Sequence, residues 1–263
     1  MPIINENRDK IDKMNRASQN VLLGTIVQKL DNVINAGSPI EYLNISGSSD
    51  DILFNVFQNG SGSAIKIGNA DNYLSISNNG DIRLSGSATT WDDLRFPANS
   101  INPPGGIGGA AVDTADSPFI GTLLFDSNTT EIVAGQAQMP HKWKLGSLIS
   151  PHVHWSPTSI STGSVVWQFD CDVASAHEAF SGTYTTSGSV AIYADGTINN
   201  HIVSGIVDLD MTGKGLSAII LWRISRIGGS ASDTYPDDAR LLEFDIHYEI
   251  DSLGSNEEYA KNT

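Results

Sequence analysis

Two histidines lie two positions apart in the segment SPHVHW, residues 150–155. Alternate side chains of a β-strand point to the same face, so His152 and His154 would present two imidazoles side by side. Imidazole nitrogens are common ligands of zinc and other transition metals, and this pair therefore predicts a metal site. The polar faces of other predicted strands add further potential ligands, namely Asp170, Asp172, Asp245 and His247. The alternative is that both imidazoles face solvent while Val153 and Trp155 pack inward.

The segment GSLISPHVH also resembles the first half of the cupin metal motif, in which five residues separate a glycine from His-x-His. Cupins carry a glutamate a few residues later, whereas this chain has Ser-Pro-Thr-Ser at 156–159, and no second cupin motif follows. A trimer offers another route to an ion, because three copies of the His-x-His pair could surround one metal on the threefold axis. A cupin-like, metal-dependent protein is therefore one hypothesis for function.

No complete catalytic motif is present in the sequence. It lacks a Gly-x-Ser-x-Gly elbow, a His-Glu-x-x-His metal motif, a Walker loop and a dinucleotide-binding fingerprint. Acidic pairs such as Asp92-Asp93 and Asp237-Asp238 are expected in a chain with 30 acidic residues, and solvated loops are the favoured interpretation. We therefore expect no enzymatic activity and no cofactor.

Two aromatic residues could instead recognise a sugar. Trp143 and Tyr235 lie in polar segments that contain proline, and both rings could stack on a sugar ring. The alternative is that each ring anchors its loop on the underlying domain. A carbohydrate-binding module that recognises a receptor is therefore a further hypothesis.

The composition limits the class of partner. The net charge is -15, from 30 acidic against 15 basic residues, which argues against binding to nucleic acid or to anionic lipid. The single cysteine, Cys171, excludes an intrachain disulfide and fits a protein made in a cytoplasm. The polar start has no signal-peptide core, and no apolar run is long enough to span a membrane.

Residues 1–38 are predicted to form a helical anchor. Leu23, Ile26, Leu30 and Val33 follow the spacing of one apolar helix face, and Gly37-Ser38-Pro39 ends the pattern. The apolar face requires a partner surface, which is either another copy of the chain or the protein's own domain.

Residues 40–90 form a quasi-repeat of short alternating strands separated by Gly, Asn, Asp and Ser. The apolar pairs are Leu43/Ile45, Phe54/Val56, Ile65/Ile67, Leu74/Ile76 and Ile82/Leu84. Each pair is too small to bury a core by itself, which predicts a shaft in which three chains cover one another. The alternative is an ordinary meander packed on the following domain.

The remaining chain divides into a linker, a head and a tail. Residues 91–118 are rich in Gly and Pro and are predicted to be a linker, although Trp91, Leu94 and Phe96 should dock on a domain surface. Residues 119–252 are predicted to form an eight-stranded β-sandwich, most simply a jelly roll, and residues 253–263 a loose tail. The strands are expected at 119–125, 131–138, 148–155, 164–174, 188–193, 201–209, 216–227 and 241–250. Alternation along 164–174 makes Cys171 a core residue.

This order of regions resembles tailed-bacteriophage virion proteins of the fibre and head-decoration type. The stretches that carry the resemblance are AIKIGNADNYLSISNNGDIRLSGS, TTWDDLRFP and SPHVHWSP. The resemblance implies a homotrimer in the virion, attached to capsid, neck or tail proteins by its N-terminus and exposing a head that can meet host surface glycans. It assigns no binding residues.

Overall fold

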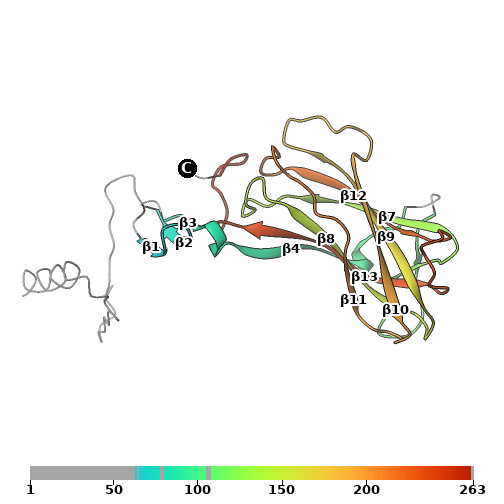
Figure 1. Ribbon diagram of the computed structural model, residues 1–263. Helices are drawn as coiled ribbons and strands as arrows, with labels where there is room; N and C mark the ends of the chain where they lie inside the picture. Colours follow the sequence, from blue (N-terminus) through green and yellow to red (C-terminus); the bar gives the residue numbers. More distant parts are fainter. Residues whose placement is uncertain (1–62, 64, 78–79, 105–107, 262–263) are drawn as a thin grey trace, which may run out of the picture. The chain divides into compact units, whose positions relative to one another are not determined.

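The computed structural model describes residues 63, 65–77, 80–104 and 108–261. The predicted N-terminal helix and the β pairs before residue 63 lie outside the described residues. The described chain is mainly β, as predicted, and the pairs between its strands are antiparallel (Figure 1). No helix in this part of the chain is long and apolar enough to cross a lipid bilayer.

Two sheets pack face to face around one core. The first has the order β10-β9-β12-β7, with the strands Thr186–Asp195, Thr162–Ala174, Ile219–Ile227 and Thr130–Gln138. The second has the order β11-β8-β13-β6-β5, with the strands Ile202–Gly205, Ile149–Pro157, Ala239–Ile250, Leu123–Phe125 and Ala111–Val112. Each of the eight strands predicted between residues 119 and 250 overlaps one of β6 to β13.

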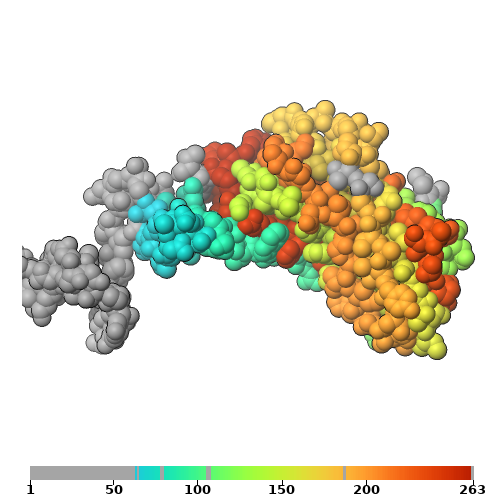
Figure 2. Space-filling view, viewed as in Figure 1, coloured from blue at the N-terminus to red at the C-terminus, as the bar shows by residue number. Residues whose placement is uncertain are grey.

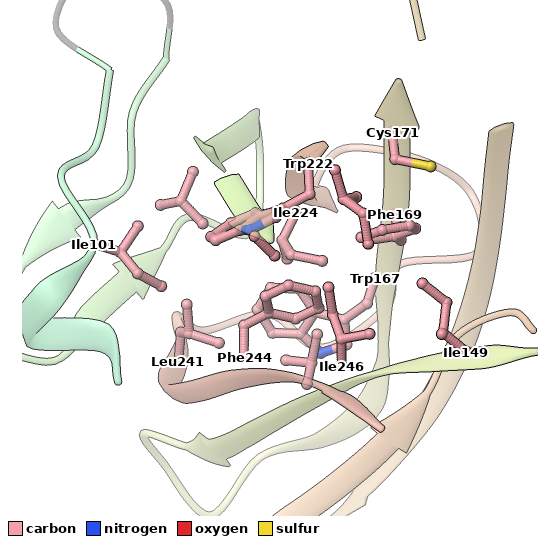
Figure 3. Packing of buried hydrophobic residues seen from close by; sticks show 14 of the residues in the cluster. Ile101, Ile149, Trp167, Phe169, Cys171, Trp222, Ile224, Leu241, Phe244 and Ile246 are labelled. Atoms are coloured by element: carbon pink, nitrogen blue, oxygen red, sulfur yellow. The ribbon is translucent and has the colours of Figure 1, made fainter. Parts of the chain in front are cut away.

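The core follows from the alternation of apolar and polar residues along the longest strands. Phe169 on β9 and Trp222 on β12 meet Phe244 on β13, with ring centres 5.8 and 4.7 Å from that of Phe244. Figure 3 shows these rings between the two layers. Cys171 lies on the same face of β9 as Phe169 and is fully buried, which confirms its prediction as a core residue.

The prediction that 91–118 is a linker is wrong for its first residues. β4, Thr90–Pro97, pairs with β13 from Thr90 opposite Ile250 to Pro97 opposite Glu243. Phe96 packs on Trp222 at 5.1 Å, so the alternation that suggested docking produces a strand of the sandwich.

A third sheet precedes the sandwich. It has the order β1-β2-β3, with the strands Ile65–Gly68, Tyr73–Ile76 and Ile82–Ser85, and short 3-10 helices follow at Gly86–Ala88 and Ala98–Ser100. The backbone N–H of Leu84 donates to the carbonyl of Asp251 at 2.7 Å. β1–β3 are the cyan atoms of Figure 2, and the C-terminal segment is dark red.

The described part of the tail is not loose. The Lys261 ammonium donates to the carboxylate of Asp251, to the hydroxyl of Ser252 and to the carbonyl of His141, at 2.6, 2.8 and 2.9 Å. These bonds hold Lys261 against Asp251 and Ser252, which follow β13, and against His141, and they correct the prediction of a loose tail as far as Lys261.

A buried ion pair organises the loop between β12 and β13. Arg226 and Asp233 have fully buried side chains and form a bidentate pair, with distances of 3.0 and 2.8 Å. The remaining guanidinium donors reach the carbonyls of Phe125, Tyr235 and Asp237. All five donors of the arginine are therefore satisfied, as a buried charge requires.

Candidate functional site

The polar residues singled out by the sequence meet on the outer face of the second sheet. β8, β13 and β4 run side by side there, with β11 on the other side of β8 (Figure 1). In the register, Asp245 lies opposite His152 on β8 and opposite Arg95 on β4, while His247 lies opposite Asp93. The side chains of this polar face line an open groove of about 570 Å³, made by Asp93, Arg95, His152, His154, His201, Val203, Leu242, Glu243, Asp245 and His247.

The inward faces of the same strands hold the groove in place. Val153 and Trp155 on β8 and Phe244 and Ile246 on β13 are fully buried in the core. Since alternate residues of a strand point to opposite faces, burying these side chains turns the histidines and carboxylates outward. The groove is therefore built mainly on strands, with His201 just before β11.

Asp245 is the centre of the polar groove. Its Oδ1 atom lies 3.2 Å from Nδ1 of His152, and its Oδ2 atom lies 2.7 Å from Nε2 of His154. Burial alone raises the pKa of Asp245, but the hydrogen bonds from the two histidines outweigh it, and the pKa falls to about 2. The hydrogen bond to Asp245 outweighs the effect of burial on His154 and raises the pKa of its imidazole. The carboxylate is therefore ionised at neutral pH.

His201, which the sequence analysis missed, extends this chain of hydrogen bonds. It immediately precedes β11, and its Nε2 atom lies 2.8 Å from Nδ1 of His154. The two ring centres are 5.1 Å apart, a separation that places the two nitrogens head to head between the rings. Such a contact requires a proton on one nitrogen and a lone pair on the other. His201, His154, Asp245 and His152 thus form one continuous chain of hydrogen bonds.

The other end of the groove is formed by β4 and β13. The Nδ1 atom of His247 lies 2.5 Å from the carboxylate of Asp93, and the indole of Trp91 stacks on the His247 ring at 4.8 Å with an angle of 3° between the planes. Arg95 forms a two-pronged pair with Glu243, at 2.5 and 2.7 Å. Trp91, Asp93 and Arg95 occupy alternate positions of β4, a pattern that could have shown from sequence that they share a face.

The predicted metal ligands divide between the two sheets. Asp245 and His247 lie beside His152 and His154, whereas Asp170 and Asp172 lie on β9 in the opposite sheet. Asp170 pairs with Arg223 at 2.6 Å, and Asp172 accepts the backbone N–H of Gly182 at 2.9 Å.

The histidine pair directs its nitrogens at a shared carboxylate rather than at a common ion. One nitrogen of His152 and one of His154 are taken up by Asp245, and the other nitrogen of His154 by His201. Within the described residues, no group of three or more His, Cys, Asp or Glu side chains is arranged to hold a metal ion. In this arrangement the His-x-His pair stabilises the groove.

The two predicted sugar-stacking residues are buried, so that prediction is wrong. Trp143 and Tyr235 have relative exposures of 0% and 1%. The indole N–H of Trp143 donates to the hydroxyl of Ser147 at 2.9 Å, and the Tyr235 hydroxyl accepts the backbone N–H of Ser159 at 3.0 Å. Both rings therefore act as loop anchors, which was the alternative interpretation.

Comparisons with known proteins do not identify a family. No protein-family model matches the chain, and no curated protein matches it. An isomalto-dextranase of Arthrobacter globiformis in complex with panose shares 15% identity with a TM-score of 0.30, over 63% of this chain and 24% of the enzyme. An arabinose-bound α-L-arabinofuranosidase shares 8% identity with a TM-score of 0.28, over 60% of this chain and 23% of the enzyme. The chain thus spans about a quarter of the length of either enzyme.

Proposed function

We propose that the protein is a non-enzymatic structural component of a tailed-phage particle, a fibre, decoration or adaptor protein with a jelly-roll head. The strand orders β6-β13-β8-β11 and β7-β12-β9-β10 are those of an eight-stranded jelly roll, a fold used by viral capsid proteins and lectins. Two stretches that resemble phage virion proteins, TTWDDLRFP and SPHVHWSP, form β4 and β8 on either side of β13.

The observation that carries the proposal is the apolar face of β1–β3. The register places Ile65, Ile76 and Ile82 in one row across the three strands, and Ile67, Leu74 and Leu84 in the next row. All six side chains therefore lie on the same face of this small sheet. None of the six is buried, and Ile67 is 64% exposed.

An apolar face of this kind favours assembly of several chains. A three-stranded sheet needs a covered apolar face for stability, and exposed apolar patches mark interaction sites. Three copies that bring these faces together would bury all the rows at once, so folding of β1–β3 and trimerisation would be coupled. A trimer would also present three heads and multiply a weak contact with the host.

The molar mass in solution tests the assembly. One chain is 28.1 kDa, so a trimer has 3 × 28.1 = 84.3 kDa by light scattering. The double substitution Ile67→Asp and Leu74→Asp places charges on the apolar face and should shift the mass to that of one chain. Lys66→Glu, an exposed residue on the opposite face of the same sheet, is the matched control and should leave the mass unchanged. A wild-type monomer would contradict the proposal.

Attachment to the particle is tested by deleting residues 1–38. The shortened protein should keep the near-ultraviolet circular dichroism of the sandwich, because its core lies within residues 90–250. It should no longer co-sediment with phage particles. Co-sedimentation equal to that of the full chain would show that residues 1–38 are not the anchor.

Recognition of a host glycan by the head is a second candidate function. The observation that favours it is the exposure of Trp91 on β4, which is 49% exposed and stacks on His247, one of the residues that line the groove.

A further inference from the structure

We propose that the groove between β11, β8, β13 and β4 binds a neutral glycan, with Trp91 as its stacking surface. The proposal names a ligand class for the head, and its biological role rests on the proposed function as a virion protein. Four features of the groove and its neighbourhood support it: an exposed indole stacked on the lining residue His247, a row of planar polar side chains, internally paired charges and a hydrogen-bond network that fixes the side chains.

Trp91 differs from every other tryptophan of the chain. The sequence contains five tryptophans, and the other four, Trp143, Trp155, Trp167 and Trp222, are at most 1% exposed. Trp91 is 49% exposed, although one face of its indole is covered by the parallel ring of His247. The stack with His247 leaves the other face of the ring as the surface on which we place the sugar. A large aromatic surface fixed in this way is suited to stack on the apolar face of a sugar ring.

Polar groups continue from Trp91 along the same face of β4. Asp93 and Arg95 follow at alternate positions, so the three side chains are spaced about 7 Å apart along the strand. The Asp93 side chain is 40% exposed and that of Arg95 is 67% exposed, so both can reach a ligand. Carboxylate and guanidinium groups offer paired acceptors and paired donors, which match neighbouring sugar hydroxyls.

The charges of the groove are already paired with one another. Glu243 is bonded to Arg95, and Asp93 to His247. Asp245 is bonded to both His152 and His154. An anionic ligand would meet three carboxylates on a chain whose net charge is -15. A cationic ligand would have to compete with the basic partner of each carboxylate. A neutral ligand rich in hydroxyl groups avoids both costs.

The network around Asp245 prepares the groove for such a ligand. It fixes the rings of His152, His154 and His201 before binding, which lowers the entropy lost when a ligand is bound. Among the described residues, Nε2 of His152 has no hydrogen-bond partner. The edge of the ring lies over Gly205, and a Cβ added to this glycine would be only 3.2 Å from Cδ2 of His152. This nitrogen can therefore bond a ligand hydroxyl without breaking the network.

A glycan array tests the ligand class with the full-length protein. The array carries neutral bacterial and hexose oligosaccharides beside matched glycans that bear uronic or sialic acids. We expect signal on neutral glycans. The best of these is then titrated while the fluorescence of the exposed indole is recorded. Calorimetry with the same glycan compares the variants, and Trp91→Ala should weaken binding about tenfold or more. Trp91→Phe, which keeps an aromatic ring, should bind with intermediate affinity.

The matched control is Tyr193→Ala. Tyr193 is 61% exposed and lies on β10 in the opposite sheet, so this variant should bind like the wild type. Binding to no neutral glycan, binding to acidic glycans alone, or equal affinity in Trp91→Ala would each overturn the proposal. Trp91→Ala should keep the molar mass and the particle association of the wild type. The Ile67→Asp and Leu74→Asp double variant should lose the mass of the trimer but still bind the glycan. The chain without residues 1–38 should lose particle association but still bind the glycan. These outcomes distinguish a failure of glycan binding from a failure of the proposed virion role.

Discussion

The Oδ2 atom of Asp245 lies 2.7 Å from Nε2 of His154, and the two groups change each other's pKa in opposite directions. The pKa of Asp245 falls to about 2, because its hydrogen bonds to the histidines outweigh the effect of burial. The pKa of His154 rises, chiefly because its imidazole donates to Asp245. The ion pair formed by the two groups therefore makes the stability of the groove depend on pH.

The first prediction concerns the pH dependence of His154. Its pKa is raised above the unfolded value, so its contribution is fully present below about pH 6.5 and is lost as the pH rises through the folded pKa. His154→Gln should therefore lower the free energy of unfolding more at about pH 5 than at about pH 9, by about 1 kcal/mol. Urea denaturation at the two pH values measures the difference.

The control for this experiment is His177→Asn. His177 has a φ of 67°, a conformation that asparagine tolerates, and its ring contacts Tyr259. It removes an imidazole that lies outside the network around Asp245. Equal losses at both pH values in His154→Gln would show that the ion pair does not stabilise the fold.

The second prediction concerns the charge of Asp245. Asp245→Asn removes the anion that both histidines contact, and it should cost about 1–3 kcal/mol of unfolding free energy near neutral pH. The cost should shrink as the pH falls from about 4 through about 2, because the wild-type carboxylate, whose pKa is about 2, becomes protonated there. The NMR titration of the His154 ring should move to a lower midpoint.

Asp93→Asn is the control, because it removes a carboxylate that is 40% exposed on the same face. It should change the free energy by less than about 0.5 kcal/mol. An unchanged His154 midpoint in Asp245→Asn would mean that the carboxylate does not set the protonation of the ring.

The third prediction concerns the buried pair of Arg226 and Asp233. Lysine carries a charge but cannot supply five donors in a fork, so Arg226→Lys leaves carbonyls and carboxylate unsatisfied. We expect a loss of about 3–5 kcal/mol, measured by chemical denaturation. The solvent-exposed pair of Arg95 and Glu243 gives the contrast, and Arg95→Lys should leave the denaturation midpoint unchanged. Similar midpoints for both variants would contradict the assigned role of Arg226.

The fourth prediction concerns Gly135. It lies opposite Trp222 in the pairing of β7 with β12, and an added Cβ would be 2.3 Å from Cζ2 of that indole. Gly135→Ala should therefore displace the ring, weaken the near-ultraviolet circular dichroism and cost about 1–3 kcal/mol. Gly215→Ala is the control, because no atom lies within 4 Å of its added Cβ. A stable Gly135→Ala protein with an unchanged spectrum would show that Trp222 can move without cost.

Local patterns in the sequence predicted much of the sandwich. The alternation of apolar and polar residues predicted that the domain is β and located eight of its strands, because a period of two identifies both a strand and its buried face. The same rule predicted the burial of Cys171 and the common face of His152 and His154. The predictions for β1–β3 as a trimeric shaft remain predictions.

Which of these residues meet could be seen only in the folded chain. The Gly and Pro content of 91–118 predicts a linker, and only the pairing of β4 with β13, which is far away in the sequence, shows that its first residues form a strand. His201 had no signal of its own, since its contact with His154 depends on the pairing of β11 with β8. Trp143 and Tyr235 lie in polar segments, yet remote parts of the chain bury them while Trp91 stays exposed. Strands and their buried faces could be predicted from local patterns, because these depend on neighbouring residues. The groove could not be predicted in this way, because strand order and register bring together side chains that no local pattern connects.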